Sequence, residues 1–331
     1  MSLFCSIIIN NYNYALFLGE AIASALNQTW TNREIIVVDD GSTDNSRHII
    51  ESFGNRIRPV FKENAGQASA YNAGFLVSSG DLVLFLDADD FLYPTCLKSV
   101  INVWTPDCSK VHFPLDIVNE AGTPTGKRIP RVLHNGNLLP LLQKFGHYSS
   151  PPGSGNIYSA RFLHEILPLS EELWIVDADS VPITLAPLFG PVVGLDTALA
   201  AHRVHHRGNS VNGTSGLNNP DHAGRLASFV RREERRYNAL HDAIARKNHT
   251  LKIPPYPKSP HLLRLHVGYL ILHAPVVEKD KISRLCIVGI KTCLTFPGYR
   301  LHERILLLSC FLLLFFFPGL SKKYLFPRIL K

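Results

Sequence analysis

The chain has 331 residues, of which 46% are hydrophobic and 18% are charged, with 34 Lys and Arg against 27 Asp and Glu. This composition excludes a disordered chain, and the length allows one large domain or an ordinary domain with a smaller one. A net charge of +7 would, taken alone, be typical of a nucleic-acid-binding protein.

The positive charge is confined to the second part of the chain. Residues 1–219 hold 14 Lys and Arg against 20 Asp and Glu, whereas residues 220–331 hold 20 against 7. An acidic N-terminal part followed by a basic C-terminal part indicates two parts with different partners. We therefore expect an anionic membrane surface, and no nucleic acid, as the partner of the basic part.

Strand and helix patterns alternate through the first ninety residues, with strands at 4–9, 34–38, 57–61 and 82–86 and helices at 16–26, 45–53 and 67–78. The polar segment 10–14 is expected to be a loop, and Ser42 or Thr43 is expected to cap the helix that follows. Because the strands are almost continuously apolar, we expect an α/β fold with a mostly parallel sheet covered by helices on both faces.

The rest of the chain has weaker patterns. We expect a hairpin or loop at 119–126, an irregular turn at 149–155 and a helix at 175–189. The Gly-, Asn- and Ser-rich segment 209–221 predicts a boundary that divides the chain into residues 1–215 and 216–331. Beyond it, apolar and basic residues combine at helical spacing over 223–247, 262–273 and 282–296.

Residues 305–317 form an apolar run interrupted only by Ser309 and Cys310. The run has 13 residues, whereas a membrane-spanning helix needs roughly 20. A buried core helix is one interpretation. The scarcity of charge within the run and the basic residues after it favour an interfacial or inserted segment on the cytoplasmic face of a membrane.

Two acidic clusters directly follow predicted strands, one at Asp39 and Asp40 and the other at Asp87, Asp89 and Asp90. Ligands bind at the carboxyl ends of strands in parallel sheets, so two clusters at that edge predict a site. An Asp-x-Asp pair suits a hard divalent cation such as Mg²⁺ or Mn²⁺, which prefers oxygen ligands.

In order, the motifs read EIIVVDDGSTDNS … KENAGQASAYNAGFLVSSGDLVLFLDADD. This pattern resembles the family-2 glycosyltransferases over roughly residues 4–210, and the resemblance implies the GT-A fold, a Rossmann-like nucleotide-sugar-binding fold. It further implies metal-dependent, inverting transfer of a sugar from a nucleotide-diphosphate donor. The acceptor would be a saccharide or a lipid-linked saccharide in cell-surface polysaccharide or glycan biosynthesis.

The resemblance also implies roles for single residues. Asp39 would accept a hydrogen bond from the nucleotide base, in a pocket lined by residues 10–14. Asp87 would approach the ribose and the metal, and Asp89 would be the main metal ligand. The nucleotide-binding residues implied in this way are Asn10, Tyr12, Asp39, Asp40, Asn72 and Asp87.

Inverting transfer requires a base that removes the proton of the acceptor hydroxyl. The family places an acidic residue at the start of a helix beyond the Asp-x-Asp pair, which implies Asp179 as the base and Asp177 as the alternative. Both could instead be helix N-terminal carboxylates. The segment AHRVHHRGNS at 201–210 resembles an element whose histidine completes the metal shell, which implies His205 as a ligand and leaves His206 open.

Three further features bear on the activity. Asn10 and Tyr71 stand where the family often has Pro and Arg, which keeps open a catalytically inactive nucleotide-sugar- or glycan-binding scaffold. A nucleotidyltransferase would need a Gly-rich, basic phosphate loop near the N-terminus, and residues 10–14 lack both Gly and Lys. The segment 151–156 resembles a loop on the acceptor side of the cleft, with an ordinary turn as the alternative.

Overall fold

The computed structural model describes residues 2–205, 222–247, 250–256, 258, 260–273 and 279–317. The chain forms two compact units, one made of Met1–Leu138 and Ser149–Val204, the other of Leu139–Tyr148 and His205–Lys331. The predicted boundary at residue 215 lies outside the described residues, so a division at that point stays a prediction.

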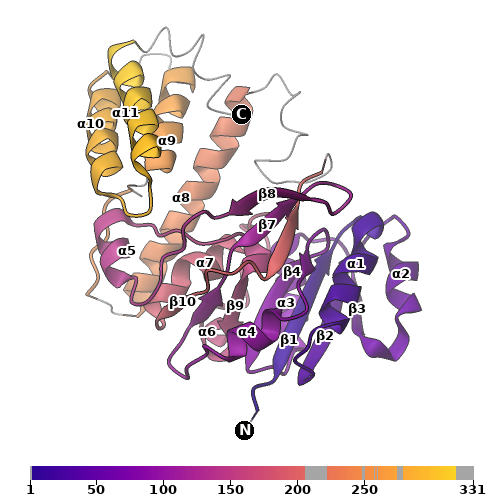
Figure 1. The fold of residues 1–331 in the computed structure, drawn as a ribbon. Coiled ribbons are helices and arrows are strands. Elements are labelled where there is room, and N and C mark those ends of the chain that lie inside the picture. The colour runs from indigo at the N-terminus through magenta and orange to yellow at the C-terminus, as the bar shows by residue number, and fades with distance from the viewer. Residues whose placement is uncertain are drawn as a thin grey trace. The chain divides into compact units, whose positions relative to one another are not determined.

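The first unit contains a seven-stranded sheet in the order β10-β6-β9-β4-β1-β2-β3 (Figure 1). Only β9 runs antiparallel to its neighbours in this sheet, which confirms the prediction of a mostly parallel arrangement. The strands are β1 (Cys5–Asn11), β2 (Arg33–Asp40), β3 (Arg58–Lys62), β4 (Leu82–Asp87), β6 (Lys110–His112), β9 (Asn156–Ser159) and β10 (Val192–Gly194).

Helices cover both faces of this sheet, and they are α1 (Ala15–Leu26), α2 (Ser46–Ser52), α3 (Gln67–Leu76), α4 (Cys96–Ile101), α6 (Ala160–Ile166) and α7 (Ser180–Leu185). On one face Ile7 of β1 shares a core with Leu18 and Ile22 of α1. On the other face α3 packs so closely that a side-chain carbon on Gly74 would lie 2.4 Å from Cγ2 of Ile8. The strands are apolar on both sides because each side is buried.

A smaller sheet has the order β5-β11-β7-β8, with strands β5 (Phe91–Leu92), β11 (Ala200–Arg203), β7 (Leu115–Val118) and β8 (Pro124–Ile129). The antiparallel pair β7 and β8 forms the hairpin expected at 119–126. The short connection between β4 and β5 joins the two sheets and carries the second acidic cluster. That cluster is therefore held between two rigid strands.

Three local predictions are wrong. β1 continues to Asn11, because its last two residues still pair with β2 and β4. Asn45, not Ser42 or Thr43, precedes α2. The helix expected at 175–189 begins only with α7 at Ser180, since Asp177 has a φ of 67° that a right-handed helix does not allow, and a 3₁₀ turn at Ala186–Leu188 follows α7.

The second unit is helical and consists of α5 (Leu139–Phe145), α8 (His222–Arg246), α9 (Pro260–His273), α10 (Lys279–Thr295) and α11 (Leu301–Phe316). The helices α9, α10 and α11 share a core that includes Leu263, Cys286 and Phe311. The apolar run 305–317 lies in α11, apart from its last residue, and one side of that helix is part of this core. None of the described helices is both long and apolar enough to cross a membrane.

Candidate active site

The carboxyl ends of β1, β2 and β4 bring the motifs together. Asn11 pairs with Asp39 across β1 and β2, and Asn10 pairs with Asp87 across β1 and β4. The chain passes from β1 to β2 on one side of β1 and returns to β4 on the other. This reversal of strand order is where open α/β sheets bind their ligands.

Asp39 is held in place by a buried hydrogen-bond network. Its Oδ1 accepts from Nδ2 of Asn11 at 2.7 Å and from Oγ of Ser42 at 2.5 Å. The same hydroxyl accepts from the backbone N–H of Asn13 at 2.9 Å. The loop after β1 and the loop after β2 are thereby joined, which orients the Asp39 carboxylate before any ligand arrives.

Asp40 points to different partners from those of its neighbour. Its carboxylate forms an ion pair with Nζ of Lys62 at 2.5 Å and accepts from the backbone N–H groups of Ala65 and Gly66 at 3.1 and 2.8 Å. Both oxygens are used inside the protein. We therefore interpret Asp40 as a residue that stabilises the Asn64-Ala65-Gly66 loop. A contact between Asp40 and the nucleotide stays a prediction.

Asn72 is also occupied within the protein. Its side chain donates to the carbonyl of Leu169 at 2.9 Å and accepts from the N–H of Leu169 at 2.8 Å. These two bonds make Asn72 an anchor for the segment that leads into 174–179. The nucleotide contact expected of Asn72 has no support from these bonds and stays a prediction.

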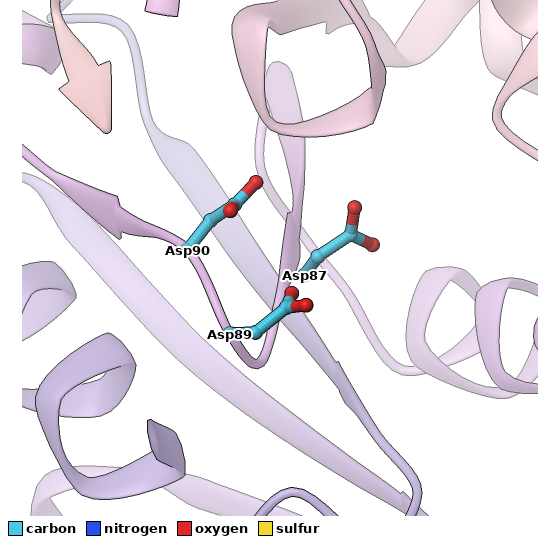
Figure 2. Close-up of side chains that lie close together, drawn as sticks. All are labelled: Asp87, Asp89 and Asp90. Atoms are coloured by element: carbon cyan, nitrogen blue, oxygen red, sulfur yellow. The ribbon is translucent and has the colours of Figure 1, made fainter. Parts of the chain in front are cut away.

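Three carboxylates gather at the end of β4 and in the turn that leads to β5. Possible ligand atoms of Asp87, Asp89 and Asp90 all lie within 4.8 Å of one another (Figure 2). Burial and the negative charges of Asp90, Asp89 and Asp179 raise the pKa of Asp87 well above its ordinary value. Such repulsion in a buried place is relieved by a cation, and carboxylate oxygens are the ligands that Mn²⁺ and Mg²⁺ prefer.

Asp179 lies across a narrow gap from this triad. A side-chain carbon on Gly153 would be 3.4 Å from Oδ2 of Asp179 and 3.5 Å from Oδ2 of Asp87. The N–H of Gly153 donates to Oδ2 of Asp179 at 3.0 Å. Burial, followed by the charge of Asp177, raises the pKa of Asp179 to about 7. A carboxylate with that pKa suits a general base near neutral pH.

The segment that carries Asp179 is tied to the start of α3. The N–H of Gln67 donates to the carbonyl of Ile175 at 2.8 Å, and its side-chain Oε1 accepts from the N–H of Ala178 at 2.8 Å. Gly66 has a φ of 90°, and a side chain there would lie 2.7 Å from the backbone of Ile175. The glycine of the Asn-Ala-Gly motif is thus required for the approach of the Asp179 segment.

The loop 151–155 also lies at the acidic site, and a buried polar cluster of Asn156 and Lys110 holds it in position by hydrogen bonds. Asn156 donates through Nδ2 to the carbonyls of Pro151, Pro152 and Gly153, at 3.3, 2.8 and 3.2 Å. Its Oδ1 accepts from Nζ of Lys110 at 3.0 Å. Lys110 is fully buried, and burial lowers its pKa well below the ordinary value.

This loop contacts both sides of the acidic site. Besides the bond from Gly153 to Asp179, the hydroxyl of Ser154 accepts from the N–H of Asp87 at 3.2 Å. Of the two interpretations of 151–156, the structure therefore favours a loop that forms part of the site over an ordinary turn.

One histidine, His202 of β11, contacts the triad. Nδ1 of His202 lies 3.2 Å from Oδ1 of Asp90. Burial lowers the pKa of His202, but the charges of Asp90, Asp89 and Asp87 outweigh it and raise that pKa to about 9. His205 is buried and belongs to the second compact unit, so its role as a metal ligand stays a prediction. His206 lies outside the described residues.

Several polar atoms near the site bind no protein group within the described part of the chain. They include both side-chain polar atoms of Asn10 and the hydroxyl of Tyr71, all shielded from solvent. Tyr71 stacks on Phe85 with ring centroids 3.9 Å apart. Tyr12 is exposed in the loop after β1. Buried polar groups without partners are costly, so those of Asn10 suggest a place for a ligand.

Comparison with known proteins agrees with this geometry. The family model described as glycosyl transferase family 2 matches residues 6–167. An uncharacterized glycosyltransferase of Nostoc sp. is 37% identical over 63% of this chain and 67% of its own length. One from Rickettsia felis is 34% identical over 52% of this chain and 30% of its own length.

Solved structures show the same fold. The crystal structure of residues 1–349 of S. aureus TarS in complex with UDP-GlcNAc aligns with a TM-score of 0.55 and 16% sequence identity. That alignment covers 97% of this chain and 92% of the other. The chain belongs to glycosyltransferase family 2, has the GT-A fold and is a transferase that acts in glycosyl transfer.

Sequence reasoning did not predict the hydrogen bonds through which four residues support the site: Asn11, Ser42, Lys110 and Asn156. Asn11 and Ser42 lie inside motifs that were recognised, so strand pairing was the missing information. The signal for Lys110 was a lysine in the short strand-like segment SKVHF at 109–113, because a charged residue in a buried strand needs a partner.

Proposed function

We propose that this enzyme transfers a sugar, with inversion, from a nucleotide-diphosphate donor to a hydroxyl group of a saccharide or lipid-linked saccharide. The single observation that carries this proposal is the position of Asp179 opposite the acidic triad, with Gly153 between Asp179 and Asp87. A base facing a group of carboxylates that can hold a cation is the arrangement that such a transfer requires.

The donor is proposed from the pocket at the ends of β1 and β2. Asp39, oriented by Asn11 and Ser42, would accept a hydrogen bond from the base of the nucleotide. Asn10 would use its shielded polar atoms on the same ligand. TarS, which shares the fold, was crystallised with UDP and with UDP-GlcNAc, and this supports a nucleoside-diphosphate donor.

A divalent cation fits the triad. Asp87, Asp89 and Asp90 would hold Mn²⁺ or Mg²⁺, since they offer hard oxygen ligands and since burial and repulsion raise the pKa of Asp87. When bound, such a cation supplies positive charge that stabilises the departing nucleoside diphosphate.

The protein's own part in the reaction is proton removal. The acceptor oxygen attacks the anomeric carbon while its proton passes to a carboxylate oxygen of Asp179. The bond from that carbon to the diphosphate oxygen breaks, and its electron pair leaves with the nucleoside diphosphate. The N–H of Gly153 fixes Oδ2 of Asp179, which leaves the carboxylate oriented for this transfer.

The acceptor and the location of the enzyme are part of the same proposal. The basic charge of residues 220–331 supports work at the cytoplasmic face of a membrane, where lipid-linked acceptors for cell-surface glycans are presented.

A donor panel tests the proposal. Thermal unfolding is measured with a set of nucleotide sugars, each with Mn²⁺, with Mg²⁺ and with a chelator. A true donor raises the melting temperature by mass action, and only with the metal present. The stabilising donor is then used in a transfer assay with wild type, Asp89→Asn and Asp39→Asn. If no donor stabilises the protein, or if wild type turns over no faster than Asp89→Asn, an inactive scaffold replaces this proposal.

A further inference from the structure

One side of α11 is apolar and exposed to solvent. Its large exposed hydrophobic side chains, which together we name the α11 face, are Leu301, Ile305, Leu306, Leu312, Leu313 and Phe316, with Phe317 directly after the helix. Along the described helix only His302 and Ser309 add other residue types to the exposed positions. Single exposed leucines are normal on a soluble protein, but a continuous apolar helix face marks an interaction surface.

The opposite side of α11 is already occupied. Leu307, Cys310, Phe311 and Leu314 lie in the core shared with α9 and α10. The helix has 16 residues, which is about 24 Å, whereas the hydrocarbon core of a bilayer is about 30 Å thick. While this core stays formed, α11 can offer only its outer side. That is the geometry of a helix lying along a membrane surface.

The charge around α11 suits an anionic surface. Residues 279–317 hold six Lys and Arg against two Asp and Glu. On the neighbouring helix α10, the positions Arg284, Ile287, Lys291 and Leu294 are all exposed and follow helical spacing. Basic side chains that alternate with apolar ones complement acidic phospholipid headgroups above an acyl layer. A second copy of this chain would bring the same positive charge, which disfavours it as the occupant.

We propose that the α11 face docks on an anionic lipid bilayer. In this arrangement α11 lies in the plane of the interface with Leu306, Leu313 and Phe316 in the acyl boundary, and Arg284 and Lys291 meet the headgroups. The inference concerns the helical unit alone and does not rest on the proposed sugar chemistry. It assigns residues 305–317 to an interfacial position and not to a crossing one.

Vesicle sedimentation of the full chain tests this docking. Vesicles contain phosphatidylcholine alone or with phosphatidylglycerol. The test variant carries Leu306→Asn, Leu313→Asn and Phe316→Ser, at side chains that are 71%, 45% and 64% exposed. The control variant carries Leu16→Asn and Leu76→Asn, two leucines of the first unit that are 68% and 84% exposed. Circular dichroism confirms that both variants are folded.

We expect wild type and the control variant to sediment with vesicles that contain phosphatidylglycerol. The partition coefficient of the test variant should fall by more than about tenfold, because three large apolar side chains leave the interface. A second variant with Arg284→Gln and Lys291→Gln should lose several-fold in binding. Binding of wild type should weaken with added salt.

Three results would overturn the docking proposal. Wild type could remain in the supernatant with anionic vesicles, or the test variant could bind as strongly as wild type. In the third, sedimentation velocity without lipid would show a wild-type dimer that the test variant abolishes, with no binding to vesicles. The α11 face would then join two copies of the chain. These binding measurements do not depend on glycosyl transfer, so an inactive enzyme would leave their interpretation unchanged.

Discussion

The acidic edge of the large sheet and the outer side of α11 use their residues in opposite ways. At the sheet edge a few carboxylates are shielded, hydrogen-bonded and close enough to shift one another's pKa. On the α11 face seven apolar side chains are exposed, and none of them has a role of its own. Catalysis needs a few groups at fixed positions, whereas docking needs area. A single substitution at the sheet edge should therefore lower the catalytic rate strongly, whereas a single substitution on α11 should weaken docking only slightly.

The largest effect is expected from Asp179→Asn. Loss of the base should lower kcat by about 10²–10⁴-fold, while the affinity for the nucleoside diphosphate changes little. Initial rates and calorimetric titration with the nucleotide measure the two quantities. Asp177→Asn is the matched control and should keep most of the activity. If Asp177→Asn were the more damaging substitution, the alternative base would be the correct one.

The same substitution should stabilise the folded protein at high pH. The pKa of Asp179 is raised in the folded state to about 7. The free energy of unfolding of wild type therefore falls as the pH rises from about 4 to 7, because the folded state holds the proton more tightly. Asp179→Asn, measured without metal, should melt above wild type at pH 8, and this advantage should vanish in acid. A lower melting temperature at pH 8 would contradict the raised pKa.

A pH profile gives the next largest effect. Since Asp179 must be ionised to accept a proton and has a pKa of about 7, kcat/KM should fall below that pH. The decrease should approach about tenfold per pH unit. Affinity for the nucleoside diphosphate, measured at the same pH values, serves as the control and should not follow this curve. A flat profile across the range would show that another group removes the proton.

A smaller effect is expected from Lys110→Met. The substitution removes the donor to Asn156, which holds the loop with Gly153 in place. We expect kcat to fall about tenfold through misplacement of the loop, with donor affinity unchanged. Lys98→Met, at an exposed lysine of α4, is the control. Equal kcat values for the two variants would show that the loop does not depend on Lys110.

Asp40→Asn should change stability and leave the chemistry intact. The loss of the ion pair to Lys62 should lower the free energy of unfolding by about 1–3 kcal/mol, as measured by urea titration. The donor KM should stay within about twofold of wild type. Asp39→Asn is the comparison and should raise the donor KM. If Asp40→Asn raised it equally, Asp40 would belong to the nucleotide site after all.

The smallest effect is expected from a single substitution on the α11 face, in contrast to the substitutions at the acidic edge of the sheet. Leu306→Asn alone, on the α11 face, should change the free energy of unfolding by less than about 0.5 kcal/mol, because the side chain is exposed. Turnover with a soluble acceptor should be unchanged, as measured by initial rates. A marked loss of stability would show that this side of α11 is covered by protein in solution.

Much of the fold followed from local patterns. The predicted bounds of the strands and helices in the first ninety residues lie within about two residues of the observed bounds. This is because the spacing of apolar residues and the polar residues that flank each element are local properties of the sequence. The end of β1 was missed, since Asn10 and Asn11 are polar and only pairing with β4 and β2 keeps them in the strand. A similar long-range cause shortened α7, where the preceding segment is bound to Gln67 of α3.

The sequence by itself determined the family, the sheet and the positions of Asp39 and Asp87 at strand ends, because each is encoded within a short stretch of chain. Only the tertiary structure decided which carboxylates act together. It turned Asp40 toward Lys62, brought Asp179 against Gly153 beside Asp87, and buried one side of α11 while exposing the other. Those outcomes depend on packing between segments far apart in the chain, and no local pattern records that packing.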